Sequence, residues 1–522
     1  MTYKLTYSTM FDPPPDMHAR FDAAMREVRG QLGRRHALHI DGADVDTATA
    51  RDKRSPIDRE WLLGSFAQAG TQEVERAMAA AAAAFPKWRA TAQQERIRLL
   101  RRVAQLIEER VYHIGAALTL EVGKNRMEAL GEVQETADFF NVYCDDFVRQ
   151  ECFDHVLPND PLPNAVSRNR SVMKPYGVWV VINPFNFPFA LAGGPVAAAL
   201  VTGNTVVLKG ASETPWAGRM LADCLRDAGL PPGVFNYLMG PGSAIGDALV
   251  QDRRTAGVTF TGSYDTGMHI IRTLAGGKYP RPCIAEMGGK NAGIVTAAAD
   301  LERAATGIVR SAFGMGGQKC SALSRLYVQE SVADQLVERI ASKIAALGVG
   351  DPTRAENWLG PVVSEKAQRN YRTYIERLRQ AGATICFGGR ALQEGDLARG
   401  FYVQPTMAEA PADAELWREE MFLPICMLRR IRDLDEGIAL ANDSELGLTA
   451  GIYGSQPEVA RFFQEIEAGV AYANRAQGAT TGAWPGYQPF GGWKGSGNTG
   501  KAIASFYYLA QYMREQSQTV VE

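Results

Sequence analysis

The stretch GQKCSALSR, residues 317–325, places Cys320 among small and polar residues. Structural cysteines are usually buried among hydrophobic side chains, so this setting raises the alternative of a reactive thiol. Upstream, Glu286 ends a short apolar segment and precedes the residues MGGKN. A thiolate can add to a carbonyl carbon, and a carboxylate can activate water. The pair is therefore a candidate for carbonyl chemistry, although either residue alone is more often structural.

The six histidines support neither a cysteine–histidine pair nor a metal site. None lies close to Cys320 in the sequence, and none shows the spacing of metal ligands. His36 and His39 stand alone in a region that we expect to be a surface loop. We predict no metal centre.

The elements that must position these residues alternate between short apolar runs and helix-length segments. The apolar runs are VWVVI (178–182), TVVL (205–208), VFNYL (234–238) and VTF (258–260). This alternation predicts βαβ units and a parallel sheet covered on both faces. A second α/β region is expected over residues 291–475.

Two glycine-rich turns follow strands of the expected first sheet. GPGSAIG (240–246) and FTGS (260–263) each lie between a predicted strand and a predicted helix. Backbone N–H groups and the helix dipole at such turns can bind a pyrophosphate. GPGSAIG is one residue longer than the standard dinucleotide fingerprint, so a purely structural role for these turns stays open.

The chain before this region is expected to be helical, with one irregular insertion. Residues 71–150 predict helices, one of them starting at a capping box of Thr91 and Gln94. The polar, proline-containing segment 151–175 predicts a protruding hairpin.

Composition limits the class of protein. The chain has 522 residues, 46% hydrophobic and 22% charged, which is ordinary for a globular enzyme of two or three domains. A formal net charge of -2 predicts no attraction to nucleic acid or to an anionic membrane. The seven cysteines are scattered without CxxC spacing, and no apolar run has the length of a membrane span. We therefore expect reduced thiols and a cytoplasmic location.

A set of motifs, in this order along the chain, resembles those of the aldehyde dehydrogenase superfamily: FNFP (185–188), LKGASETP (208–215), FTGS, EMGGKN (286–291), GQKC (317–320), EEMFLPI (419–425) and PFGGWKGSG (489–497). The resemblance covers about residues 40–515. It implies an α/β fold with three parts. These are a Rossmann-like NAD(P)-binding domain (1–150 and 176–290), an α/β catalytic domain (291–477) and a small β oligomerisation element (151–175 and 478–522).

The resemblance implies a role for each catalytic residue. Cys320 would be the nucleophile, forming a thiohemiacetal and then a thioester with the aldehyde. The side-chain amide of Asn186, with the backbone N–H of Cys320, would hold the developing oxyanion. Glu286 would activate the hydrolytic water, which disfavours transfer of the acyl group to coenzyme A. A non-catalytic structural member of the family, the remote alternative, would be expected to lose these residues.

The resemblance also implies a cofactor site. Lys209 is similar to the residue that binds the adenosine ribose, and Glu420 to the one that binds the nicotinamide ribose. Ser212 replaces a ribose-binding glutamate and so removes a charge that would repel a 2′-phosphate, although Glu213 is adjacent. NAD or NADP is expected, with a slight preference for NADP. The full expected set is Lys209, Ser212, Gly242, Gly246, Gly262, Ser263, Glu420 and Phe422.

Within the superfamily, three segments look most like 1-pyrroline-5-carboxylate dehydrogenases: GGQKCSALSRLYV, EVGKN (121–125) and TGAWPGYQPFGG (481–492). That branch oxidises L-glutamate γ-semialdehyde in proline catabolism, and its carboxylate anchor corresponds to Ser321, Gly482 and Ala483. The segment before Gly482 is longer than is usual in the branch, and Trp484 and Tyr487 add aromatic bulk. The alternative is a dehydrogenase of a larger or aromatic aldehyde.

The resemblance finally implies self-association. The segment after PFGG is rich in tyrosine and includes the strand-like QTVV. In this family such a tail joins the 151–175 hairpin to extend the sheet of a neighbouring subunit. We therefore expect a homo-oligomer, a dimer or higher.

Overall fold

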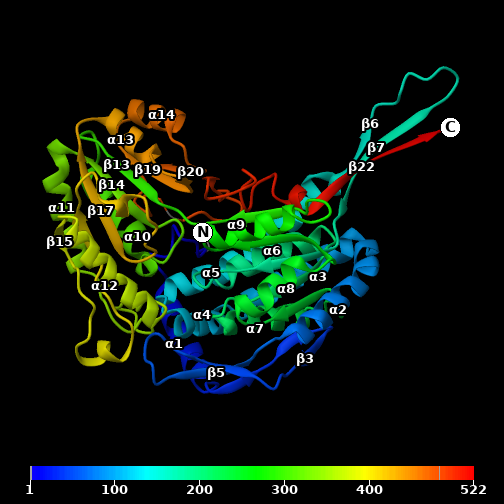
Figure 1. Ribbon diagram of the computed structural model, residues 1–522, viewed down its shortest axis with the longest axis horizontal. Coiled ribbons are helices and arrows are strands. Elements are labelled where there is room, and N and C mark those ends of the chain that lie inside the picture. The colour runs from blue at the N-terminus through cyan, green and yellow to red at the C-terminus, as the bar shows by residue number, and fades with distance from the viewer. Residues whose placement is uncertain (1–2, 481) are drawn as a thin grey trace.

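The computed structural model describes residues 3–480 and 482–522. Figure 1 shows two sheets with covering helices lying next to each other, and a third, narrow sheet that extends away from them. The α/β class predicted from the alternation of apolar runs and helices is confirmed.

The first sheet has seven strands in the order β12-β11-β8-β9-β10-β2-β3. Strands β8 to β12 run parallel, and β2 and β3 add an antiparallel edge. Every residue of β9 is buried, as expected for a strand covered on both faces. The strands are β2 (Leu38–Ile40), β3 (Ala43–Val45), β8 (Val178–Ile182), β9 (Thr205–Lys209), β10 (Phe235–Leu238), β11 (Thr255–Thr261) and β12 (Cys283–Glu286). The helices between them are α6 (Ala190–Val201), α7 (Pro215–Asp227), α8 (Asp247–Gln251) and α9 (Tyr264–Ala275).

Residues 71–149 form the predicted helical region, and one prediction there is wrong. The helices are α2 (Thr71–Ala90), α3 (Gln93–Glu109), α4 (Val111–Val122) and α5 (Arg126–Arg149), preceded by α1 (Pro15–Arg29). The N-cap of α3 is Ala92 and it has no side-chain cap, so Thr91 and Gln94 do not form a capping box. The Thr91 hydroxyl instead donates to the carbonyl of Lys87, in the last turn of α2.

The two histidines expected in a surface loop also lie elsewhere. His36 ends β1 (Arg34–His36) and stacks on Phe66, with ring centroids 4.7 Å apart. His39 is buried in the middle of β2. Strand β1 belongs to a small sheet with β4 (Ala50–Arg54) and β5 (Leu62–Ala67).

The second sheet also has seven strands, in the order β15-β16-β17-β14-β13-β19-β20, all parallel except β15. Alternate residues of β14 enter the two cores on its faces: Leu326 and Val328 on one side, Tyr327 on the other. The strands are β13 (Asn291–Val295), β14 (Leu323–Gln329), β15 (Thr384–Phe387), β16 (Thr406–Glu409), β17 (Ile425–Ile431), β19 (Thr449–Tyr453) and β20 (Val470–Ala473). Its helices are α10 (Leu301–Phe313), α11 (Glu330–Ala345), α12 (Glu365–Gln380), α13 (Leu434–Asn442) and α14 (Gln456–Glu465).

The third sheet is the arm that projects in Figure 1. It consists of the predicted hairpin, β6 (Asp154–Leu157) and β7 (Ser167–Pro175), together with β22 (Met513–Val521). Strand β22 pairs antiparallel with β7 along its whole length. Within residues 3–480 and 482–522, no helix combines the length and apolar character needed to cross a membrane.

Candidate active site

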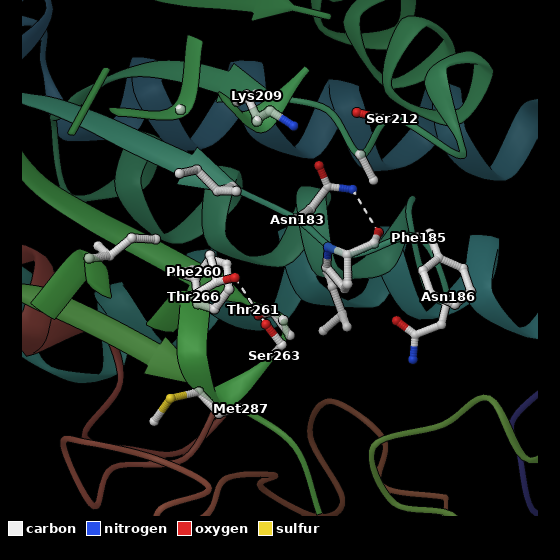
Figure 2. A pocket seen from close by; sticks show the side chains of 18 of the residues that line it. Asn183, Phe185, Asn186, Lys209, Ser212, Phe260, Thr261, Ser263, Thr266 and Met287 are labelled. Atoms are coloured by element: carbon white, nitrogen blue, oxygen red, sulfur yellow. Dashed lines mark hydrogen bonds between the residues drawn. The ribbon is translucent and has the colours of Figure 1, made fainter. Parts of the chain in front are cut away.

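A cleft of about 720 Å³ lies where strands of the first sheet end, and loops that lead into strands of the second sheet close it. The carboxyl ends of parallel strands are the usual place for a ligand in such folds. Figure 2 shows Lys209 and Ser212 along one edge of the view, with Asn186 and Met287 towards the opposite edge. All eight residues expected to bind cofactor line this cleft, and so do Asn186 and Cys320. Glu286, Ser321, Gly482 and Ala483 do not belong to its lining.

Cys320 lies in a tight turn between α10 and β14, and hydrogen bonds from Asn291 stabilise this turn. The side-chain amide of Asn291 donates to the carbonyls of Cys320 (2.7 Å) and Ala322 (2.8 Å). Its oxygen accepts from the backbone N–H of Thr449 at 3.0 Å. Gly317, three residues earlier, has φ +64, and a Cβ there would lie 2.2 Å from the carbonyl oxygen of Leu423. The turn thus packs directly on the backbone before β17, which requires glycine.

The thiol of Cys320 is only partly exposed. Burial raises its pKa to about 12, and the negative charges of Glu420 and Glu286 act in the same direction. Backbone N–H groups of Ser321 and Cys320 lower the pKa, but less. The thiol therefore holds its proton at neutral pH, and attack on a carbonyl requires that a base remove it.

Glu286 is the last residue of β12 and is 6% exposed. The backbone N–H of Gly492, within the PFGG motif, donates to its carboxylate at 3.2 Å. Burial raises the pKa of this carboxyl to about 8, and the Gly492 hydrogen bond opposes the shift. A carboxyl group with such a pKa suits a general base that works near neutral pH.

The loop that carries Asn186 follows β8 and is fixed at the start of α6. Asn186 is 2% exposed, and its side chain lines the cleft. The carboxylate of Glu132 accepts from the backbone N–H groups of Phe189 (2.8 Å) and Ala190 (3.2 Å), at the positive end of the helix dipole. Lys124 forms a buried ion pair with Glu132, and its ammonium lies 3.8 Å from the ring centroid of Phe187.

The far end of the cleft is suited to the phosphates and adenosine ribose of a dinucleotide. A Cβ at Gly242 or Gly246 would meet nothing within 4 Å, so the π-helical turn Gly242–Gly246 faces open space. Burial lowers the pKa of Lys209 to about 8, and its ammonium donates to the carbonyl of Gly210 at 3.0 Å. The hydroxyl of Ser212 donates to the backbone carbonyl of Gly240 at 3.4 Å, a contact within the first α/β domain.

Glu420 and Phe422 close the cleft from the second sheet. The carboxylate of Glu420 accepts from the backbone N–H of Gly289 at 2.9 Å, and burial raises its pKa to about 7. The ring of Phe422 meets that of Phe185 edge-on at 5.8 Å. These residues fit a dinucleotide: an open glycine turn for phosphate, a cation in the cleft and a carboxylate for a ribose hydroxyl.

The three residues expected to anchor a substrate carboxylate lie outside the lining of the cleft. The hydroxyl of Thr480 donates to the carbonyl of Ser321 at 2.7 Å. The carbonyl of Gly482 accepts from Arg475 at 2.8 Å, and Gly482 lines a small cavity beside Lys319, the neighbour of Cys320. Ala483 is half-buried next to it.

Sequence reasoning missed the residues that hold the catalytic ones. Asn291 and Lys124 stand in the motifs EMGGKN and EVGKN, which were used only as marks of family resemblance. Their polar side chains within two residues of a glycine were the available signal. Glu132 gave none, because an acidic residue in a helix is ordinarily a surface residue.

Comparison with known proteins shows which proteins the chain is similar to. Residues 44–518 match the model of the aldehyde dehydrogenase family. A 1-pyrroline-5-carboxylate dehydrogenase of Geobacillus thermodenitrificans is 38% identical over 508 residues, covering 96% of each chain. The structure of a 1-pyrroline-5-carboxylate dehydrogenase from Thermus with bound NAD superposes with a TM-score of 0.92 at 34% identity, covering 100% of this chain and 99% of that one. A 3,6-anhydro-L-galactose dehydrogenase in complex with NAP gives a TM-score of 0.86 at 32% identity, covering 93% of this chain and 100% of the other.

Proposed function

The chain belongs to the aldehyde dehydrogenase family, and we propose that it oxidises L-glutamate γ-semialdehyde to glutamate. The observation that carries this proposal is that Cys320 lines the cofactor cleft, whereas its neighbour Lys319 and the expected anchor residue Gly482 line a separate small cavity. Similarity to relatives of that name along nearly the whole chain supports it.

The proposed reaction assigns each residue a step. The Cys320 thiol gives up its proton to water as its sulfur bonds to the aldehyde carbon, and the amide of Asn186 donates to the oxyanion that forms. NAD or NADP, which Lys209 and Glu420 would hold, would accept the hydride that leaves this carbon, and the adduct on Cys320 would thereby become a thioester. The carboxylate of Glu286 then takes a proton from water, which attacks the thioester carbon and releases the acid and the Cys320 thiol.

The substrate is tested by comparing turnover of glutamate semialdehyde with a panel of short aliphatic and aromatic aldehydes. We expect kcat/KM to be highest for glutamate semialdehyde, because its α-carboxylate can bind at Ser321, Gly482 and Ala483. Propanal, which lacks that carboxylate, should be at least about tenfold poorer, the usual loss when a built polar subsite is left unfilled. A higher kcat/KM for an aromatic aldehyde would overturn the proposed substrate and favour the second candidate.

That second candidate, oxidation of a bulkier aldehyde, rests on one observation. Trp484 directly follows the expected anchor and is 2% exposed, so an aromatic wall lies beside the substrate side. A structural relative named for a sugar aldehyde shows that the same fold occurs in an enzyme named for a different substrate.

We also propose that NADP binds at least as well as NAD. Ser212 is neutral, and the one acidic neighbour, Glu213, pairs with Arg51 of β4 at 3.3 Å. Lys53 of the same strand is buried, and the charge of Glu213 raises its pKa against the larger effect of burial. Two cations beside Glu213 reduce the repulsion that a 2′-phosphate would meet.

Ser212→Glu should therefore raise the KM for NADP while leaving the KM for NAD within a factor of two or so. The expected increase is about tenfold or more, because a new carboxylate would face the phosphate. Arg51→Ala, which frees Glu213, should raise the KM for NADP in the same direction but by less. Steady-state kinetics with both cofactors measures this, and an unchanged NADP-to-NAD ratio in Ser212→Glu would contradict it.

We propose in addition that the three parts inferred from the sequence are the cofactor-binding domain (1–150 and 176–290), the catalytic domain (291–477) and the oligomerisation element (151–175 and 478–522). In this proposal the arm of β6, β7 and β22 joins subunits of a homo-oligomer. Val156, Val520 and Val521 on the arm are more than half exposed, which supports a partner covering it.

A further inference from the structure

The N-terminal segment Tyr3–Phe11 lies against the substrate side of the site. The ring of Tyr7 meets that of Trp484 edge-on, with centroids 5.1 Å apart. On its other side the same ring meets Phe187, which follows the oxyanion residue Asn186, at 6.2 Å. Tyr7 thus stands between the loop expected to anchor the substrate and the loop that carries the oxyanion donor.

Polar contacts hold Tyr7 and its segment in place. The Tyr7 hydroxyl donates to the half-buried carboxylate of Glu135 in α5 at 2.5 Å. The next residue, Ser8, accepts from Arg475 at 3.0 Å, and the same guanidinium nitrogen donates to the carbonyl of Gly482 at 2.8 Å. One arginine therefore joins the N-terminal segment to the expected anchor.

A second junction lies at Asp138 of α5. The indole N–H of Trp484 donates to its carboxylate at 2.7 Å, and Lys4 forms an ion pair with the same oxygen at 2.9 Å. Trp484 is buried, so its position is fixed, whereas Lys4 is exposed and its pair is easily broken. The Lys4 contact can therefore break without moving Trp484.

The space behind Tyr7 is too small for the proposed substrate. The cavity that Tyr7 lines with Phe187, Lys319 and Gly482 measures about 20 Å³, room for about one water molecule. Residues Tyr3–Leu5, by contrast, line an open groove of about 1080 Å³ between α5 and Gly486–Tyr487. The segment thus borders both a nearly filled inner cavity and an open outer groove.

We propose that Tyr7 closes the substrate side of the reaction centre and sets the size limit on the aldehyde. Tyr7 is a specificity-determining residue in this proposal, which rests on the proposed aldehyde oxidation but not on the identity of the aldehyde. The Tyr7 side chain must move to admit a substrate larger than a water molecule. Its contacts with Trp484, Phe187 and Glu135 oppose that movement. Access to Cys320 from this side is then governed by the fraction of molecules in which Tyr7 is displaced.

The test measures access to Cys320 directly. With NAD at saturation, the cofactor cleft is occupied, and N-ethylmaleimide must approach Cys320 from the substrate side. The rate of Cys320 alkylation, followed by peptide mass spectrometry, should rise about tenfold or more in Tyr7→Ala, because a gating conformation is commonly open in only a few per cent of molecules. Tyr7→Phe keeps the ring but loses the hydrogen bond to Glu135, so its rate should lie above wild type but well below that of Tyr7→Ala. Tyr3→Ala is the matched control, since Tyr3 lies on the same segment and its hydroxyl donates to the carbonyl of Thr9, away from Trp484 and Phe187.

Specificity provides the second readout. In Tyr7→Ala the ratio of kcat/KM for phenylacetaldehyde to that for propanal should rise by a similar factor, and Tyr7→Phe should restore the wild-type ratio. If Tyr7→Ala does not fold, Tyr7→Leu, which retains apolar packing, takes its place. Wild-type rates and ratios in a folded Tyr7→Ala or Tyr7→Leu protein would overturn the proposal. Failure of the wild-type enzyme to oxidise glutamate semialdehyde would overturn only the substrate assignment, because the alkylation rates do not depend on it.

Discussion

Cys320→Ala should abolish aldehyde oxidation, lowering kcat by at least about 10⁴-fold. In the proposed mechanism the sulfur forms the bond that converts the aldehyde into a hydride donor, and no other thiol lines the cleft formed by the described residues. The production of reduced cofactor under saturating substrate measures the loss. Cys386→Ala is the matched control, because Cys386 is a half-buried thiol in the edge strand β15 and should leave kcat unchanged.

Binding of the cofactor distinguishes lost chemistry from lost structure in this variant. Because Lys209, Glu420 and the glycine turns are untouched, Cys320→Ala should bind NAD with the wild-type dissociation constant, measured by titration calorimetry. Turnover within tenfold of wild type would contradict the role of Cys320 as nucleophile.

Glu286→Gln should separate the oxidation from the hydrolysis. Glutamine cannot accept a proton from water, so steady-state kcat should fall by about 10²–10⁴-fold, the usual contribution of a general base. The first turnover does not need that water, so rapid mixing should still show a burst of about one equivalent of reduced cofactor per site. Mass spectrometry should then find the acyl group on Cys320.

The pH dependence follows from the raised pKa of Glu286. A general base works only when deprotonated. The hydrolytic rate of the wild-type enzyme should therefore be low well below pH 8, rise as the pH passes through the Glu286 pKa of about 8, and level off above it. This dependence should disappear from the slow turnover of Glu286→Gln, and an added small thiol should restore release of the acyl group. Loss of the burst together with the steady-state rate would assign Glu286 to an earlier step.

The sequence predicted best where a residue's own chemistry determined its place. The run VWVVI became β8 with the predicted bounds, because β-branched apolar residues suit a strand buried on both faces. The glycine turns and the residues of the cofactor cleft came together, because parallel strands end at one edge of the sheet. The capping box at Thr91 failed because the competing bond to Lys87 is equally local and cannot be distinguished by residue type.

What the sequence could not predict depends on contacts between distant segments. Tyr7 and Glu135 lie 128 residues apart, and nothing in either neighbourhood specifies the other. The pKa of Cys320 is a similar case. A polar sequence setting raised the alternative of a reactive thiol, whereas burial, with Glu420 and Glu286 nearby, raises the pKa of the thiol and keeps it protonated.

The short connection from Met287 to Lys290 joins the two seven-stranded sheets. Glu286 ends the last strand of one sheet, and Asn291, which holds the Cys320 turn, begins the first strand of the other. Each sheet can form from its own contiguous stretch of chain, but neither alone contains a complete reaction centre. The recovery of enzyme activity during refolding should therefore report when the two halves dock. A later change in the angle between the two sheets would change the distance between Cys320 and Glu286.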